Sequence, residues 1–305
     1  MSSPRVVTTL PAVTEIVCAL GVDPVGVSHS CDYPERVADI PTVTSSPIDT
    51  DASSAEIDRQ VRELAADGVY DIDGERLAAL EPDLIITQET CEVCAVDESL
   101  VDATLESLAI DPNVLAVDPH TMAGVLATIE QIGTAIGRKS ETERLLASLE
   151  DRIDAVRQPI ADEPRQRVAV LDWTDPVMIA GHWVPELVEW AGGTYPLAEP
   201  GDPSRPREWD EILEADPEIL IVGPCGFSIE EIETNLADLE RPGWADLTAV
   251  QDGRVWAMDG SAYLNRPGPR LVDSLEHLAG ICQPEQFDSP PLDVARPLLE
   301  VAPRL

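Results

Sequence analysis

The chain has 305 residues and carries 58 Asp and Glu residues against 20 Lys and Arg, which gives a formal net charge of −38. This length suffices for about two domains with real cores, and an apolar fraction of 44% argues against disorder. The sequence offers no basic stripe to neutralise phosphates, which argues against nucleic-acid binding. Lys139 is the only lysine, and carboxylates spread over the whole length predict an acidic surface adapted to strong salt, as in halophiles.

The start of the sequence enters an apolar run almost at once, with no secretory leader or lipidation cysteine in front of it. No stretch approaches the roughly 20 apolar residues that span a bilayer. We expect the chain, as it stands, to be cytoplasmic and not membrane-spanning, or extracellular and membrane-associated if a leader precedes it. Six cysteines are too few for a disulfide scaffold and are expected as thiols or metal ligands.

The first part of the chain alternates short apolar runs with segments of helical spacing. Gly21 is expected to end the first helix. Alternating strands and helices predict a parallel sheet with both faces covered. Strands are predicted at 6–10, 25–28, 84–87 and 114–117, and helices at 11–20, 75–80 and 101–108.

The middle of the chain does not alternate in this way, because two long segments of helical spacing follow each other without a strand between them. The first begins at Thr121 and ends at Gly137, and Ser140 with Glu143 then forms the pattern of a capping box. The second period covers about 18 residues, or about 27 Å. It is predicted to be a connector helix that closes at Pro159.

The second half restarts the alternation, with strands predicted at 168–171, 219–222 and 255–258 and helices at 185–191, 209–214 and 271–281. The segments LEPDLII (80–86) and EADPEILIV (214–222) are similar, which indicates one unit used twice. Prolines near the end predict an extended tail over the surface. The expected organisation is an N-terminal lobe (1–120), a helical connector (121–159), a C-terminal lobe (160–283) and a Pro-rich tail (284–305).

Several motifs resemble those of the helical-backbone (class III) solute-binding proteins of the iron-siderophore and vitamin B12 type. They are LPAVTE (10–15) with ALG (19–21), the segment 80–86, the connector helix, and Trp244 with GRVW (253–256). The sequence is especially similar to leaderless cobalamin-binding relatives through CDYP (31–34), CEVCAV (91–96), GHWVPE (181–186) and NRPGPR (265–270). The resemblance covers about residues 5–282. It implies an α/β fold of two Rossmann-like lobes, each with a mainly parallel sheet covered by helices, joined by one long connector helix, with the ligand cleft between the lobes.

Ligands of open parallel sheets bind beyond the carboxyl ends of the strands, and the loops expected there are rich in aromatic residues. A corrin ring is a broad, mostly apolar plate edged with amides, so flat side chains with a polar handle suit it. Core packing is the alternative for each ring, and it is the expected role of Trp190 and Trp244. The candidate ligand-binding residues are Thr14, Tyr33, Trp173, His182, Trp183, Trp209, Phe227 and Arg266.

Histidine and arginine add polar candidates. His182 follows a glycine in a predicted loop and could ligate the cobalt of a corrinoid, as could His29, although a solvent-facing histidine that binds nothing is the alternative. His120 and His277 are expected to be structural. Arg266, with Arg270, could clamp a carboxylate, phosphate or propionamide edge, or pair with one of the many acids.

The cysteines are the least expected feature. Cys31, Cys91, Cys94 and Cys225 each follow a predicted strand and could converge on one cleft. A C-x-x-C pair is shared by metal sites and redox pairs, so zinc, an iron–sulfur cluster, a dithiol that reduces a bound cobalt and plain buried thiols all stay open. Cys18 and Cys282 are predicted on helices and are expected to pack as small hydrophobic residues.

The motifs of common hydrolases, nucleotide-binding proteins and zincins are missing from the sequence, so no enzyme is predicted. We expect a protein that binds a corrinoid, cobalamin or a precursor, for uptake, salvage or handling. One alternative is the substrate-binding protein of an ABC importer for B12, ferric siderophore or haem, whose permease would dock on exposed glutamates such as Glu98, Glu230 or Glu231. The other is a cysteine-ligated metal or redox protein on the same scaffold.

Overall fold

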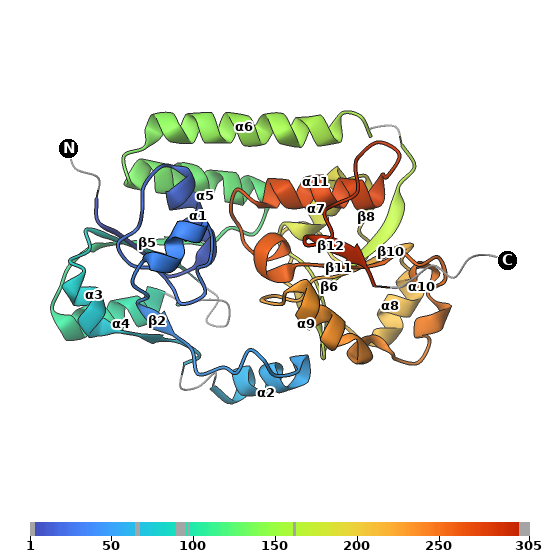
Figure 1. Cartoon of the computed structure of the whole chain (residues 1–305), viewed down its shortest axis with the longest axis horizontal. Coiled ribbons are helices and arrows are strands. Elements are labelled where there is room, and N and C mark those ends of the chain that lie inside the picture. Colours follow the sequence, from blue (N-terminus) through green and yellow to red (C-terminus); the bar gives the residue numbers. More distant parts are fainter. Residues whose placement is uncertain (1–3, 65–67, 90–95, 97, 161–162, 299–305) are drawn as a thin grey trace. The chain divides into compact units, whose positions relative to one another are not determined.

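The computed structural model describes residues 4–64, 68–89, 96, 98–160 and 163–298 (Figure 1). The chain divides into two compact units. Unit 1 comprises residues 1–52, 56–119 and 123–148, and unit 2 comprises residues 53–55, 120–122 and 149–305. The main sheet of unit 1 is parallel, and that of unit 2 is mixed, with a parallel centre and antiparallel strands on both sides of it. The predicted α/β fold with two lobes is confirmed. The predicted connector is α6 (Lys139–Arg157), which contributes residues to both units.

The sheet of unit 1 is parallel and has its strands in the order β1-β4-β5. Val7 and Ile85 face the same side of it and pack with Leu77, Val101 and Leu105 from two helices. Proline at the first position of α1 costs no helical hydrogen bond, because the N–H of that position has no partner within the helix. The elements are β1 (Val6–Thr8), α1 (Pro11–Ala19), η1 (Glu35–Asp39), β2 (Thr44–Ser45), α2 (Ser54–Leu64), β3 (Asp71–Ile72), α3 (Gly74–Ala79), β4 (Leu84–Gln88), α4 (Glu98–Leu108), β5 (Asn113–Val117) and α5 (Met122–Ala135).

The sheet of unit 2 has the order β12-β11-β10-β6-β7-β9, with β8 also paired to β6. The strands β6, β10 and β11 are parallel and form its centre. Residues 168–171 and 219–222 are wholly buried, which explains their continuous apolar runs. The elements are β6 (Gln166–Thr174), β7 (Val177–Ile179), α7 (Val184–Trp190), β8 (Gly193–Thr194), β9 (Arg205–Pro206), α8 (Trp209–Ala215), β10 (Ile219–Val222), α9 (Ile229–Thr234), η2 (Leu236–Leu239), η3 (Trp244–Asp246), α10 (Thr248–Gln251), β11 (Val255–Met258), η4 (Gly260–Leu264), α11 (Leu271–Cys282) and β12 (Ala295–Pro297).

The two similar sequence segments fold alike, as α3–β4 in unit 1 and α8–β10 in unit 2. In each, the residue before the proline takes a left-handed backbone, with φ of 43° at Glu81 and 39° at Asp216. The acid after the proline then accepts the backbone N–H of an arginine at the start of the neighbouring strand. Asp83 accepts from Arg5 at 2.8 Å, and Glu218 accepts from Arg167 at 2.9 Å.

Two local predictions for the first half are wrong. Residues 25–28 form only the isolated bridges Val7↔Gly26 and Val27↔Thr42, because one paired residue on each side does not make a strand. Ser140 is not a helix cap, because α6 already begins at Lys139. The carbonyl of Arg138 accepts both the N–H and the hydroxyl of Thr142, at 2.9 and 2.8 Å.

Two segments of the second half contain strands that the sequence did not reveal. Residues 172–183, between the predicted strand 168–171 and the predicted helix 185–191, hold the end of β6 and the antiparallel strand β7. The tail, predicted to lie over the surface, supplies β12, which pairs with β11 and buries Ala295 completely. Strands of three residues, such as β7 and β12, are too short to show a periodic pattern in the sequence.

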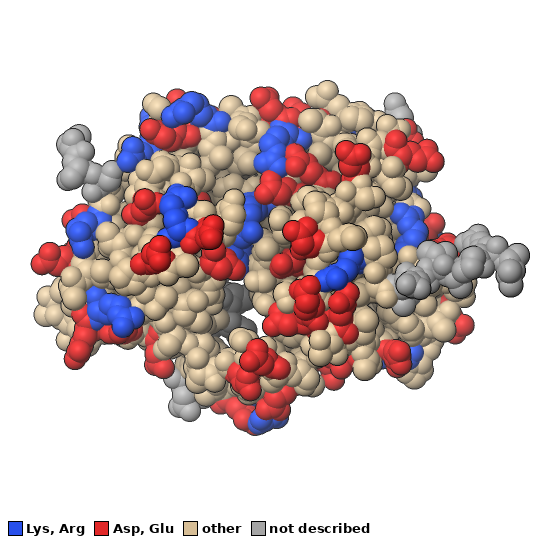
Figure 2. All heavy atoms as spheres, viewed as in Figure 1, with Lys and Arg blue, Asp and Glu red and all other residues tan. Residues whose placement is uncertain are grey.

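The surface is strongly acidic. Figure 2 shows the carboxylates spread over the whole visible face, with fewer arginines among them. Across the residues that the structure describes, no helix is both long enough and apolar enough to cross a membrane.

Candidate functional site

In unit 1, a layer of buried hydroxyl groups supports the loops that follow β1 and β4. The Thr14 hydroxyl lies 2.6 Å from the Thr8 hydroxyl and 3.1 Å from the sulfur of Cys31. Thr9 donates to Thr87 at 2.9 Å. Thr14 is wholly buried, so in this conformation it ties α1 to the loop that carries Cys31.

Tyr33 differs from these residues in its exposure. It is 47% exposed and precedes a cis peptide bond to Pro34. Its ring therefore presents apolar surface on the same loop that Thr14 and Cys31 hold in place.

In unit 2, two predicted ligand residues meet at the carboxyl ends of β6 and β10. The rings of Trp173 and Phe227 lie edge to face with their centroids 5.2 Å apart. The indole N–H of Trp173 donates to the carbonyls of Ser54 and Asp175, at 3.2 and 3.1 Å. The Ser54 hydroxyl also lies 2.6 Å from that of Thr174. These bonds fasten the first residue of α2 to the end of β6 and fix the Trp173 ring.

Arg241 connects this strand end to a second aromatic pair. Its guanidinium donates to the carbonyl of Thr174 at 2.8 Å and lies 5.9 Å from the ring centre of Trp209. Trp209 in turn stacks on Trp244, with centroids 6.2 Å apart, and donates its N–H to the carbonyl of Pro242 at 2.9 Å.

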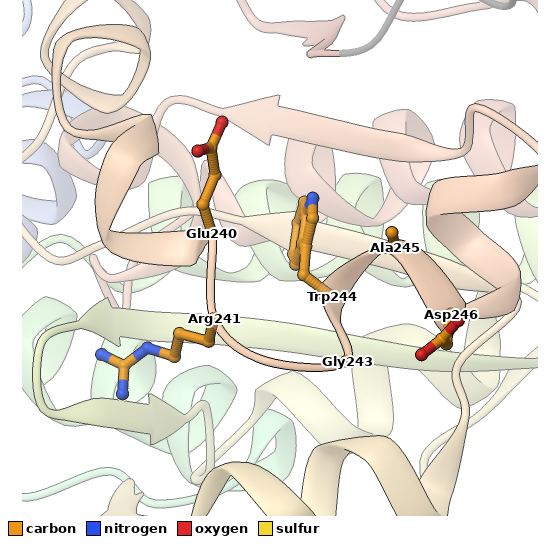
Figure 3. A pocket seen from close by; sticks show the side chains of 6 residues that line it. All are labelled: Glu240, Arg241, Gly243, Trp244, Ala245 and Asp246. Carbon is orange, nitrogen blue, oxygen red and sulfur yellow. The ribbon is translucent and has the colours of Figure 1, made fainter.

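An open depression of about 270 Å³ lies against these rings and is lined by Glu240, Arg241, Gly243, Trp244, Ala245 and Asp246 (Figure 3). Figure 3 shows the Trp244 ring and the Glu240 carboxylate on the same side of the loop. The sequence assigns Trp244 to packing alone, but the structure places it in the lining of this depression. Only tertiary structure reveals this, since Trp209 and Trp244 are 35 residues apart.

His182 and Trp183 form a third aromatic group, which includes a residue predicted to be structural. The two rings stack at 5.5 Å, and the Trp183 N–H donates to the carbonyl of Leu264 at 2.9 Å. The Nδ1 atom of His182 lies 3.1 Å from that of His120. His182 has a φ of 53°, and its carbonyl accepts the N–H of Gly201 at 2.9 Å.

The segment NRPGPR (265–270) holds the strand-end loops together. The Asn265 amide donates to the carbonyls of Gly223 and Gly260, both at 3.0 Å. Arg266 is 8% exposed and donates to the Ser261 hydroxyl at 3.2 Å. Burial raises the pKa of the nearby Asp259 carboxyl, an effect opposed by backbone N–H donors and by the charge of Arg266.

The sequence did not single out Asp172, which lies near the end of β6. Its pKa is raised by burial, and the Ser204 hydroxyl, which bonds to the carboxyl group, offsets part of that effect. The same hydroxyl accepts the N–H of Gly181 at 3.1 Å. Asp172 therefore supports the loop that presents His182.

Of the four cysteines predicted to converge on one cleft, the structure describes Cys31 and Cys225, which belong to different units. Cys31 lies in unit 1, the exposed Cys225 follows β10 in unit 2, and Cys91 and Cys94 lie outside the described residues. In the described ranges, no three His, Cys, Asp or Glu side chains are grouped so that they could hold a metal ion.

The remaining cysteines are buried on helices. Burial raises the pKa of the Cys18 thiol to about 11 and that of Cys282 to about 12. Both therefore stay protonated at neutral pH and pack as small apolar groups.

Two of the glutamates considered for docking have partners within unit 2. Glu230 accepts from Arg296 of β12 at 2.6 Å. Glu231 accepts the N–H of Ser228 at 2.7 Å in the capping box of α9. The third, Glu98, is the first residue of α4 in unit 1.

Comparison with known proteins identifies the family. The model of the periplasmic binding protein family matches residues 6–262. An uncharacterized ABC transporter substrate-binding lipoprotein of Bacillus subtilis is 23% identical over 293 residues, which cover 93% of this chain and 81% of the relative. The vitamin B12-binding protein of Salmonella typhimurium is 24% identical over 279 residues, which cover 91% and 89%. The solved structure of a periplasmic haem-binding protein from Roseiflexus, in apo form, matches with a TM-score of 0.68 and 25% identity over 92% of this chain and 98% of that chain. Because the family model covers most of the sequence, this chain belongs to the periplasmic binding protein family.

Proposed function

We propose that this protein is the substrate-binding protein of an ABC importer and that its ligand is a corrinoid, cobalamin or a precursor. The observation that carries the proposal is the fixed pair of Trp173 and Phe227 at the carboxyl ends of parallel strands, next to the guanidinium of Arg241. Rigid rings beside a polar donor suit a broad apolar plate with amide edges. A vitamin B12-binding protein among the relatives supports the same ligand class.

The predicted site residues divide into two roles under this proposal. Tyr33 and Trp173 contact the ligand, and Trp209 extends the aromatic surface through Arg241. The buried residues act as supports that hold these rings and loops, namely Thr14, Trp183, Phe227 and Arg266. His182 is a candidate axial ligand of cobalt through Nε2, because its Nδ1 faces His120.

Haem is the second candidate ligand. The observation that favours it is the haem-binding structure from Roseiflexus, which resembles this chain over nearly its full length. Haem is also a flat apolar plate, but its propionates would demand a cationic partner, for which Arg241 and Arg266 are the candidates.

The test is a titration of the purified protein in strong salt with hydroxocobalamin, cobinamide and haemin, followed by spectroscopy and gel filtration. We expect one corrinoid per chain to stay bound. Trp173→Ala should weaken binding about tenfold or more, whereas Trp190→Ala, which removes a ring stacked under Arg157, should leave it unchanged. A band shift that is lost in His182→Asn would establish the axial ligand.

Other outcomes would redirect the assignment. Binding of haemin alone would establish the second candidate. Binding of none of the three would overturn both. Stoichiometric iron or zinc that disappears when Cys91 and Cys94 become serine would favour the cysteine-ligated metal or redox protein.

The place of action can be tested separately. An importer component works outside the cytoplasmic membrane, in keeping with the lipoprotein among the relatives. Cell fractionation should therefore find the protein in the extracytoplasmic or membrane fraction. A wholly cytoplasmic signal would instead support salvage or handling of the corrinoid inside the cell.

A further inference from the structure

Two histidines from distant parts of the sequence approach each other in unit 2. His120 precedes α5, and His182 lies between β7 and α7. Their Nδ1 atoms are 3.1 Å apart, and the ring planes are inclined by 23°. The sequence gives His120 no functional role.

The backbone around both rings is fixed by several independent contacts. His182 keeps a left-handed φ of 53°, and a side chain at the neighbouring Gly181 would overlap the carbonyl of Asp202. The ring of Trp183 stacks on His182. On the other side, the N–H of Met122, two residues after His120, donates to Glu186 at 2.7 Å. These contacts hold the backbone at both histidines, so the two rings lie close together without any rearrangement of the chain.

The spacing of the two nitrogens fits one metal ion. Metal–nitrogen bonds of about 2.0–2.1 Å place two imidazole nitrogens roughly 2.9 Å apart at a right angle and about 3.4 Å apart at a tetrahedral angle. The observed 3.1 Å lies between these limits, and without an ion it is the length of a hydrogen bond from one ring nitrogen to the other. Imidazole nitrogen is a preferred ligand for divalent zinc, nickel and copper.

We propose that His120 and His182 chelate a divalent transition-metal ion of the zinc, nickel or copper class through their Nδ1 atoms. Within the described part of the chain, no third histidine, cysteine or carboxylate completes a ligand group. A site with two histidine ligands exchanges its ion readily. This site does not depend on the proposed corrinoid function, because it forms without that ligand. An ion on Nδ1 leaves the ring proton of His182 on Nε2, so it competes with axial ligation of cobalt by the same residue.

The test is calorimetric titration of tag-free protein with Ni²⁺ after its accessible thiols have been alkylated. We expect one saturable site per chain. His120→Gln and His182→Asn should each lower the affinity about tenfold or more, and asparagine tolerates the left-handed backbone at 182. The matched control is His29→Asn, a histidine of unit 1 whose Nδ1 lies 2.8 Å from the Thr44 hydroxyl, which should leave binding unchanged.

A second measurement needs no variant. Substoichiometric Ni²⁺ should broaden the ring proton signals of two of the four histidines in the nuclear magnetic resonance spectrum. Absence of a saturable site, unchanged affinity in both folded variants, or broadening of all four signals alike would overturn the proposal.

Discussion

At the scale of single residues, hydrogen bonds of the indole rings decide how unit 2 presents its aromatic surface. Each of the three tryptophans predicted for the ligand donates its N–H to a backbone carbonyl. A buried indole N–H needs such an acceptor, and the acceptor fixes the plane of the ring. Trp173 and Trp209 are half-buried, whereas Trp183 is buried and packs in the interior.

The carboxyl group of Asp172 should give stability an unusual dependence on pH. Burial raises its pKa, so the folded chain holds this proton more tightly than the unfolded chain. The contribution of Asp172 to stability is fully present below its pKa in the unfolded chain, about 3.9, and is lost as the pH rises through its pKa in the folded chain. Asp172→Asn should therefore melt a few degrees above the parent at pH 8, with the gap closing near pH 4, in thermal melts monitored by circular dichroism.

Asp216 provides a control of opposite sign. The N–H and hydroxyl of Thr248 donate to its carboxylate at 2.9 and 2.8 Å and lower its pKa. The contribution of Asp216 to stability is present above its pKa in the unfolded chain and is lost as the pH falls through its pKa in the folded chain. Asp216→Asn should therefore melt below the parent at pH 7 and approach it in acid. Shifts of the same sign in both variants would contradict this account.

At the scale of elements, close packing of two helices depends on one glycine. A Cβ atom on Gly133 of α5 would overlap the side chain of Thr142 of α6. Thr142 has little freedom to move, because its hydroxyl is bonded to the carbonyl of Arg138. The two helices run antiparallel in Figure 1, and their close approach at this point depends on the absence of a side chain at Gly133.

Gly133→Ala should destabilise the protein despite the better helix propensity of alanine. The gain in propensity is about 1 kcal/mol, whereas overpacking costs about 1–3 kcal/mol. We expect a lower midpoint in urea unfolding. Adding Thr142→Ala should restore part of the loss, because it removes the overlapping hydroxyl and methyl groups. A double variant no more stable than Gly133→Ala would show that the overlap is not the cause.

At the scale of the whole molecule, the excess of acidic residues dominates the electrostatics. A net charge of −38 on 305 residues repels itself in dilute buffer, and Figure 2 shows acidic residues scattered over the visible face. At 1 M salt the Debye length falls to about 3 Å, so most of this repulsion is screened. Stability should therefore depend strongly on the ionic strength.

Raising KCl from 0.1 to 2 M at pH 7.5 should raise the melting temperature by several degrees or more in scanning calorimetry. The same change at pH 5, where more of the carboxylates are protonated, should raise it less. A melting temperature that stays constant or falls with salt at pH 7.5 would argue against a surface adapted to strong salt.

The sequence by itself determined the class of fold and most of its regular elements. Buried central strands such as β10 are continuous apolar runs, and the repeated segment before β4 and β10 carries its proline and acid in the sequence. These signals are local, because they depend on periodicity and on residues within one turn. The motif resemblance supplied the family for the same reason, since its residues lie in short stretches.

Only the tertiary structure decided which side chains meet. The pairs His120 with His182, Trp209 with Trp244 and Trp173 with Phe227 are separated by 62, 35 and 54 residues. Short strands such as β7 and β12 are stabilised by pairing with their neighbours rather than by their own pattern. Contacts of this kind depend on where the sheet brings distant segments, a property that no local pattern of residues encodes.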